Sequence, residues 1–147
     1  MGLTGTIDAS VYTGLRDVLS RYPKITTVGF EPDSISKEYI RASIAPDRIE
    51  PPTGPEPPLL EVEWRFRRET ESYRIHYADP NTGFNCGWHR DKDHPDPGSI
   101  HFQYEHRSTR ESDRIRAEFT KSVPTEILWT AFHRLFETKI PAYTSTR

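Results

Sequence analysis

Histidine is concentrated in one stretch of this 147-residue chain. Five of the six histidines fall between positions 76 and 106, a stretch that makes up about a fifth of the chain. They are His76, His89, His94, His101 and His106. Imidazole changes its charge near neutral pH and also binds transition metals, so it serves as an acid, a base or a ligand. The cluster therefore points to acid–base catalysis or to a metal site.

Metal-independent cleavage of RNA needs a base for the 2′-hydroxyl, an acid for the leaving 5′-oxygen and a cation for the charged transition state. Two histidines and an arginine on one rigid face would meet these needs. We take His76 and His101 as the acid–base pair, with Arg74 or Arg65 as the cation. No metal or cofactor is expected for this chemistry. The residues expected to bind the substrate around the pair are Arg65, His89, Gln103 and Arg107.

Two other interpretations of these residues stay open. The solvent face of a sheet commonly carries histidine and arginine with no catalytic role. Mixed imidazole and carboxylate ligands would also suit a metal ion, although their spacing matches no established metal motif. The residues that could form such a site are His89, Asp91, Asp93, His94 and His101.

The segments that carry the histidines alternate apolar and polar residues. Residues 59–68, 72–78, 84–90 and 99–106 each place an aromatic or other apolar side chain at every second position. Alternation of this kind, with short turns between segments, is typical of an antiparallel meander with one apolar face. The opposite face then collects polar side chains, namely Glu63, Arg65, Arg74, His76, His89 and His101.

The turn at 79–83 determines the expected register of the central hairpin. It contains Pro, Asn and Gly, which favour turns. Tyr77 must share a face with Cys86, which requires a four-residue loop at 80–83, because a slip of one residue would reverse every side chain. Extended by parity to the preceding hairpin, this register predicts four pairs: Arg74 with His89, His76 with Gly87, Glu63 with His76, and Arg65 with Arg74.

Helices are predicted at both ends of the meander. Residues 8–22 have apolar residues at helical spacing, with Asp8 or Ser10 as the cap and Pro23 as the stop. Pro124 suits the first turn of a second helix, whose apolar stripe would cover the sheet. Strands are expected at 25–30 and 37–45, and the proline-rich segment 50–59 reads as a stiff surface loop. Residues 107–123 are compatible with a loop or a partial helix.

These elements predict one α+β domain over residues 1–147. It would be an antiparallel meander of about five to six strands, with one face covered by the N- and C-terminal helices. Aromatic residues make up 12% of the chain, which argues against a disordered tail. Trp64 and Trp88 are expected in the core, and Cys86 on the apolar face is expected to be a small buried side chain rather than a nucleophile.

Composition excludes several classes of protein. No apolar run approaches the roughly 18–20 residues of a membrane span, so no membrane association is expected. No signal peptide is evident, and a single cysteine cannot form an internal disulfide, which favours the cytoplasm. The net charge of −2 means that any nucleic-acid binding must come from a local basic patch.

Four short motifs suggest a family. Tyr73-Arg-Ile-His-Tyr77, Cys86-Gly-Trp88, His94-Pro95 and Ile100-His-Phe102 together resemble the TumE-like toxins of prokaryotic toxin–antitoxin modules, and their small haloarchaeal relatives in particular. The similarity runs from the strand near Lys37 to the final helix. It implies a toxin that acts as a ribonuclease and is neutralised by a helix-turn-helix antitoxin from the same operon. The site residues that it implies are His76, His94 and His101.

The chain departs from that family pattern at two positions. His89 stands where relatives usually have aspartate, and Gln103 replaces the second histidine of a His-Phe-His strand. These departures disfavour a metal held by two histidines of one strand. They leave single-histidine acid–base chemistry, and they also allow an inactive member. The alternative function is a non-catalytic, partner-binding or regulatory module of such an operon, using residues 107–116 or the proline loop. The chain could also form a homodimer.

Overall fold

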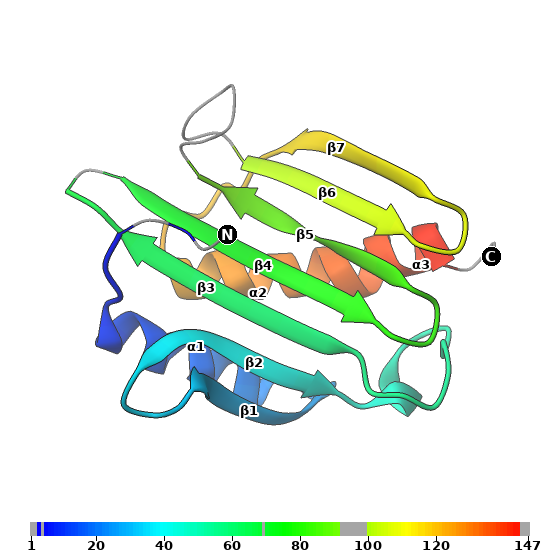
Figure 1. Ribbon diagram of the computed structural model, residues 1–147, viewed down its shortest axis with the longest axis horizontal. Coiled ribbons are helices and arrows are strands. Elements are labelled where there is room, and N and C mark those ends of the chain that lie inside the picture. The colour runs from blue at the N-terminus through cyan, green and yellow to red at the C-terminus, as the bar shows by residue number, and fades with distance from the viewer. Residues whose placement is uncertain (1–2, 4, 69, 92–99, 145–147) are drawn as a thin grey trace.

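A seven-stranded antiparallel sheet, with its strands in chain order, forms the frame of the molecule (Figure 1). The computed structural model describes residues 3, 5–68, 70–91 and 100–144. The strands are β1 (Ile25–Pro32), β2 (Lys37–Ile44), β3 (Leu59–Phe66), β4 (Glu71–Asp79), β5 (Phe84–Arg90), β6 (Ile100–His106) and β7 (Glu111–Ala117). Each strand pairs with the next one in the chain, as expected for a meander.

Helices cover one face of this sheet (Figure 1). They are α1 (Ala9–Arg21) near the N-terminus and α2 (Pro124–Arg134), which continues through a π-helical turn, η2 (Leu135–Lys139), into α3 (Ile140–Thr144); a short 3-10 turn, η1 (Pro46–Arg48), follows β2. The predicted α+β fold is therefore confirmed. Of the two candidate caps, Asp8 is the one that accepts hydrogen bonds from the first turn of α1. No helix in the described residues is long and apolar enough to cross a membrane.

The core lies between the helices and the inward face of the sheet. Trp64 and Trp88 are at most 1% exposed, and Tyr77 and Cys86 are buried with them, as alternation predicted. Tyr12 links α1 to the sheet, because its hydroxyl accepts a hydrogen bond from the Trp64 backbone N–H at 3.1 Å. The same hydroxyl donates to the Glu38 carbonyl at 2.8 Å. The helix layer is thus held in place by both packing and a buried polar contact.

The expectation of about five to six strands was too low, because β7 adds a seventh. This strand comes from the segment that was compatible with a loop or a partial helix. Six of its seven residues are exposed and only Ala117 is partly covered. An edge strand that is solvated on both faces needs no apolar alternation, so periodicity could not reveal it. Its backbone pairing with β6 holds it in the sheet.

The register of the central hairpin is confirmed, whereas that of the preceding hairpin was wrong by two residues. Strand β4 ends at Asp79 and β5 begins at Phe84, and the predicted pairs of Arg74 with His89 and His76 with Gly87 are present. In β3, however, Glu61 rather than Glu63 faces His76. Glu63 faces Arg74, and Arg65 faces Ser72. A shift of two residues keeps every side chain on its own face, so alternation alone cannot detect it.

Candidate functional site on the open sheet face

The sheet face turned away from the helices carries a continuous line of charged and imidazole side chains, which we call the histidine row. Its members lie directly opposite one another from β3 to β7, and they are Glu63, Arg74, His89, His101 and Arg116. Opposed residues in antiparallel strands have Cα atoms about 4.5–5.5 Å apart, so neighbouring side chains are within reach of each other. His89 and His101 are therefore adjacent, with an arginine on either side.

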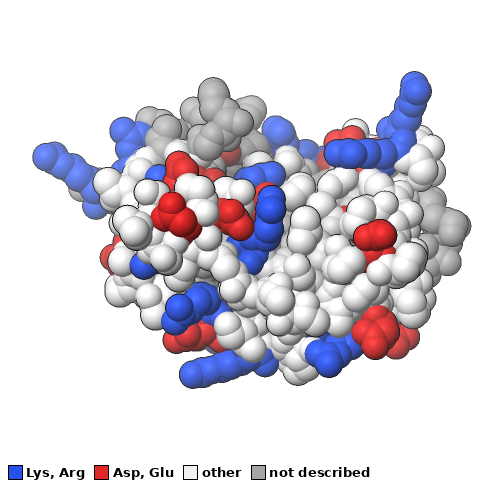
Figure 2. Space-filling view, turned by 60° about the horizontal axis from the view of Figure 1, so that its bottom comes forward, with Lys and Arg blue, Asp and Glu red and all other residues white. Residues whose placement is uncertain are grey.

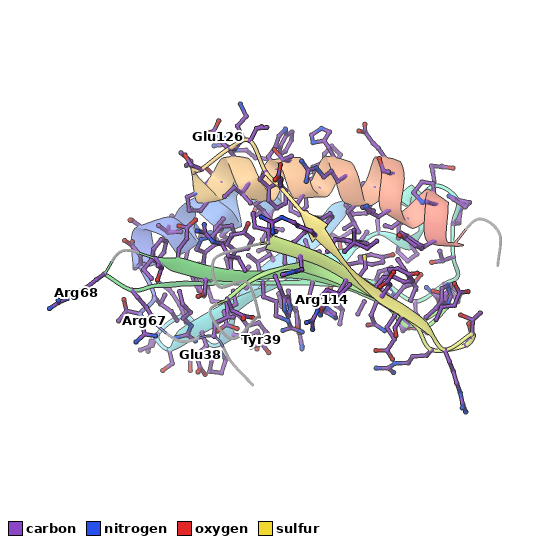
Figure 3. The ribbon with its side chains drawn as sticks, turned by 90° about the horizontal axis from the view of Figure 1, so that it is seen from above. Glu38, Tyr39, Arg67, Arg68, Arg114 and Glu126 are labelled. Atoms are coloured by element: carbon purple, nitrogen blue, oxygen red, sulfur yellow. The ribbon has the colours of Figure 1, made fainter. Side chains whose placement is uncertain are left out.

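Figure 3 shows the two faces of the sheet edge-on. Glu38 and Tyr39 of β2 project away from the helix layer, whereas Glu126 of α2 lies on it (Figure 3). The histidine row is on the same side of the sheet as Tyr39. No helix among the described residues covers this side. His89 and His101 are half-buried there, and the Nε2 atom of His89 and the Nδ1 atom of His101 are buried.

A second line, which we call the hollow row, runs beside the histidine row and two residues away along each strand. It consists of Arg41, Glu61, His76, Gly87, Gln103 and Arg114. His76 and His101 consequently lie in different rows and are separated by β5. Strand spacing and residue rise place their Cα atoms roughly 12 Å apart. The structure thus sets His89, rather than His76, beside His101.

Of the other predicted site residues, the structure places some beside these two rows and others away from them. Arg65 is beside the histidine row, where its Nε donates to the Glu63 carboxylate at 2.9 Å. Gln103 lies between Gly87 and Arg114 in the hollow row. Arg107 does not join them: it follows the end of β6, where its backbone N–H donates to the Gly83 carbonyl. Its position is six residues beyond His101, or roughly 20 Å along the strand. His94 lies outside the described residues.

His76 is held in its neutral form by its surroundings. Burial lowers the pKa of its imidazole to about 4, and the positive charge of Arg74 acts in the same direction. The Glu61 carboxylate and a hydrogen bond with Asn85 oppose this shift. The Nδ1 atom is buried and has no hydrogen-bond partner among the described residues. His76 is uncharged at neutral pH and cannot act there as an acid.

Two hollows open on this face, one on each side of His76. The first, which we call the β6 hollow, has a volume of about 410 Å³ and is lined by His76, Asn85, Gln103, Glu105, Ser112 and Arg114, among others. The second has a volume of about 350 Å³ and lies over β2–β4, where it is lined mainly by charged residues, including Glu38, Glu61, Glu63, Arg65 and Arg74. Ligand sites commonly fall in this range of volumes.

Gly87 lies opposite His76 on one side and Gln103 on the other. A Cβ atom at this position would overlap the carbonyl oxygen of Ile75 on the neighbouring strand. The close approach of β4 and β5 therefore requires glycine here. Gly87 itself is buried and is not among the residues that line the β6 hollow.

Charge is not uniform across the open face. At the β2–β3 end, Arg41 and Arg65 are paired with Glu61 and Glu63, each at 2.9 Å. At the other end, β7 contributes arginines to both rows. The side of the molecule turned forward in Figure 2 shows basic and acidic residues interspersed, in keeping with a net charge of −2.

The described residues do not support a metal site or a cysteine nucleophile. Among them, no group of three or more His, Cys, Asp and Glu side chains could hold a metal ion. Asp93 and His94, two of the proposed ligands, are not part of this described set. Cys86 is fully buried, and burial raises the pKa of its thiol, so it is unsuited to act as a nucleophile.

Sequence reasoning missed several residues that the fold brings to the site. Arg114 and Arg116 come from β7, whose strand character alternation did not show. Glu61 was not placed opposite His76 because of the register error in β3. Alternation places Glu105 and Asn85 on the polar face, but only the folded structure shows that both line the β6 hollow.

Comparison with protein-family models, with curated proteins and with solved structures gave no match to this chain. The resemblance of its motifs to the TumE-like toxins therefore stays a prediction.

Proposed function

We propose that the protein is a small ribonuclease that serves as the toxin of a toxin–antitoxin module, with the histidine row as its catalytic centre. The observation that supports this proposal best is the adjacency of His89 and His101 between Arg74 and Arg116. Two neighbouring imidazoles between two cations match the needs of a phosphodiester undergoing transfer.

The reaction would proceed by attack of the ribose 2′-oxygen on the adjacent phosphorus. One imidazole of the pair accepts the 2′-hydroxyl proton, and the other donates a proton to the departing 5′-oxygen. The P–O5′ bond breaks as the O2′–P bond forms, which leaves a 2′,3′-cyclic phosphate and a free 5′-hydroxyl. Arg74 and Arg116 stabilise the negative charge that develops on the phosphate oxygens. His76, neutral beside Arg74, helps to shape the centre.

Cleavage of a labelled single-stranded RNA in the presence of EDTA tests this proposal. General acid–base catalysis contributes about 10²- to 10⁴-fold to a rate. We therefore expect His89→Ala and His101→Ala each to slow cleavage by about 100-fold or more, and His76→Ala to have a smaller effect. The control is His133→Ala, on the helix-covered side of the molecule, which should cleave like the wild type. An all-deoxy strand should resist, because it has no 2′-hydroxyl.

The absence of cleavage, or cleavage that survives both His89→Ala and His101→Ala, would refute a catalytic histidine row. A larger loss in His76→Ala than in His89→Ala would instead restore the pair expected from the sequence. In cells, induced expression of the wild type should stop growth, while His101→Ala should not. A helix-turn-helix protein encoded next to this chain should restore growth when it is expressed with the toxin.

One observation favours the alternative, a non-catalytic module that binds a partner. Strand β7 is the exposed edge of the sheet and has an apolar side chain, Ile115, that is 44% exposed. Open strand edges readily pair with a strand of another chain. Co-purification of the protein with the neighbouring gene product, together with a lack of RNA cleavage, would support this function over the first.

A further inference from the structure

The β6 hollow offers hydrogen-bonding groups of more than one kind. Gln103 and Glu105 extend from β6 at alternate positions, and Ser112 and Arg114 face them from β7. The Gln103 amide and the Glu105 carboxylate make no hydrogen bond or ion pair with another residue in the described part of the chain.

The hollow is also well placed relative to the histidine row. Gln103 is two residues from His101 on β6, and Arg114 is two residues from Arg116 on β7. Two residues of a strand span roughly 7 Å, which is close to the distance between a base and a phosphate of an adjoining nucleotide. A strand of RNA with a phosphate on the histidine row could therefore place a base in the hollow.

The chemistry of the hollow selects among the bases. A carboxylate accepts two hydrogen bonds, and a guanidinium donates two in a fixed fork. Guanine alone combines two adjacent donors, N1–H and N2–H₂, with two adjacent acceptors, O6 and N7, and the contact of an arginine with O6 and N7 is common. Adenine has one amino donor group, and uracil has a single N–H. Glu105 and Arg114 together therefore match guanine best.

We propose that the β6 hollow binds a guanine base of single-stranded RNA, with Glu105 accepting from N1–H and N2–H₂ and Arg114 donating to O6 and N7. Gln103 would hydrogen-bond at the remaining edge. This assignment rests on the proposed ribonuclease function and adds to it a preference for cleavage next to guanosine. Recognition of unstacked bases through their hydrogen-bonding edges is the usual way in which proteins identify single-stranded RNA.

The test is equilibrium binding of labelled oligouridylates that carry one guanosine, inosine or adenosine at the centre. All 2′-positions are methylated, so that cleavage cannot interfere. A bidentate contact with a base discriminates by roughly 5- to 150-fold. We expect guanosine to bind tighter than adenosine by a factor in this range, with inosine, which lacks the 2-amino group, in between. The Glu105→Gln variant should lose most of this preference, because the NH₂ group of glutamine would face a guanine N–H donor where the carboxylate presents an acceptor.

The matched control is Glu137→Gln, an exposed carboxylate on η2, on the helix side of the molecule, which should retain the preference. Equal affinity for the three oligonucleotides, failure to bind any of them, or a guanosine preference that survives in Glu105→Gln would overturn the assignment. RNA cleavage without a guanosine preference would reject the guanine site and leave the ribonuclease proposal standing. A guanosine preference that depends on Glu105, without cleavage, would support the site and reject the ribonuclease.

Discussion

The pH dependence of stability should carry the signature of His76. The pKa of its imidazole is about 4 in the folded protein, against about 6.5 in an unfolded chain. Because the folded value is the lower one, the unfolded chain binds the additional proton between these two pH values, and acidification destabilises the fold. The penalty is absent above about pH 7, grows to about 2–3 kcal/mol near pH 4.5, and levels off at about 3 kcal/mol below pH 4.

Urea unfolding at about pH 7 and about pH 4.5, followed by tryptophan fluorescence, measures this penalty. The comparison is between the wild type and His76→Gln, because the contributions of all other titrating groups cancel in the difference. We expect His76→Gln to gain about 2 kcal/mol relative to the wild type as the pH falls. His133→Gln should leave the dependence on His76 in place. If the stability difference between His76→Gln and the wild type were the same at both pH values, burial would not be suppressing the charge on His76.

Two further changes test the packing that positions the site. Gly87→Ala should lower the free energy of unfolding in urea by about 1–3 kcal/mol, because the added methyl group overlaps the Ile75 carbonyl oxygen. The control is Gly29→Ala on β1, where a Cβ meets nothing within 4 Å, and it should change stability by less than about 0.5 kcal/mol. Equal losses in the two variants would show that the close approach of β4 and β5 does not require glycine. Tyr12→Phe should cost about 1–3 kcal/mol, because it leaves the buried Trp64 N–H without its acceptor. An unchanged urea midpoint for Tyr12→Phe would show that this contact contributes nothing to stability.

The faces of the strands could be predicted from the sequence, but the complete register could not. Alternation correctly put Tyr77 and Cys86 on the buried face, and the turn at 79–83 then determined which residues pair across the central hairpin. Between β3 and β4 the same reasoning misplaced Glu63 by one full period. Since a two-residue shift moves no side chain to the other face, it leaves the hydrophobic pattern unchanged, and only the turn and the packing select the true register.

The candidate site shows the same division. The sequence by itself determined that His76, His89 and His101 lie on one polar face, because a period of two is a local property of the strand. Only the tertiary structure decided that His89 neighbours His101, that Arg114 and Arg116 join them from β7, and that the β6 hollow forms beside them. These relations depend on pairing between strands and on an edge strand stabilised by its neighbour, and the burial that suppresses the charge of His76 exists only in the assembled sheet.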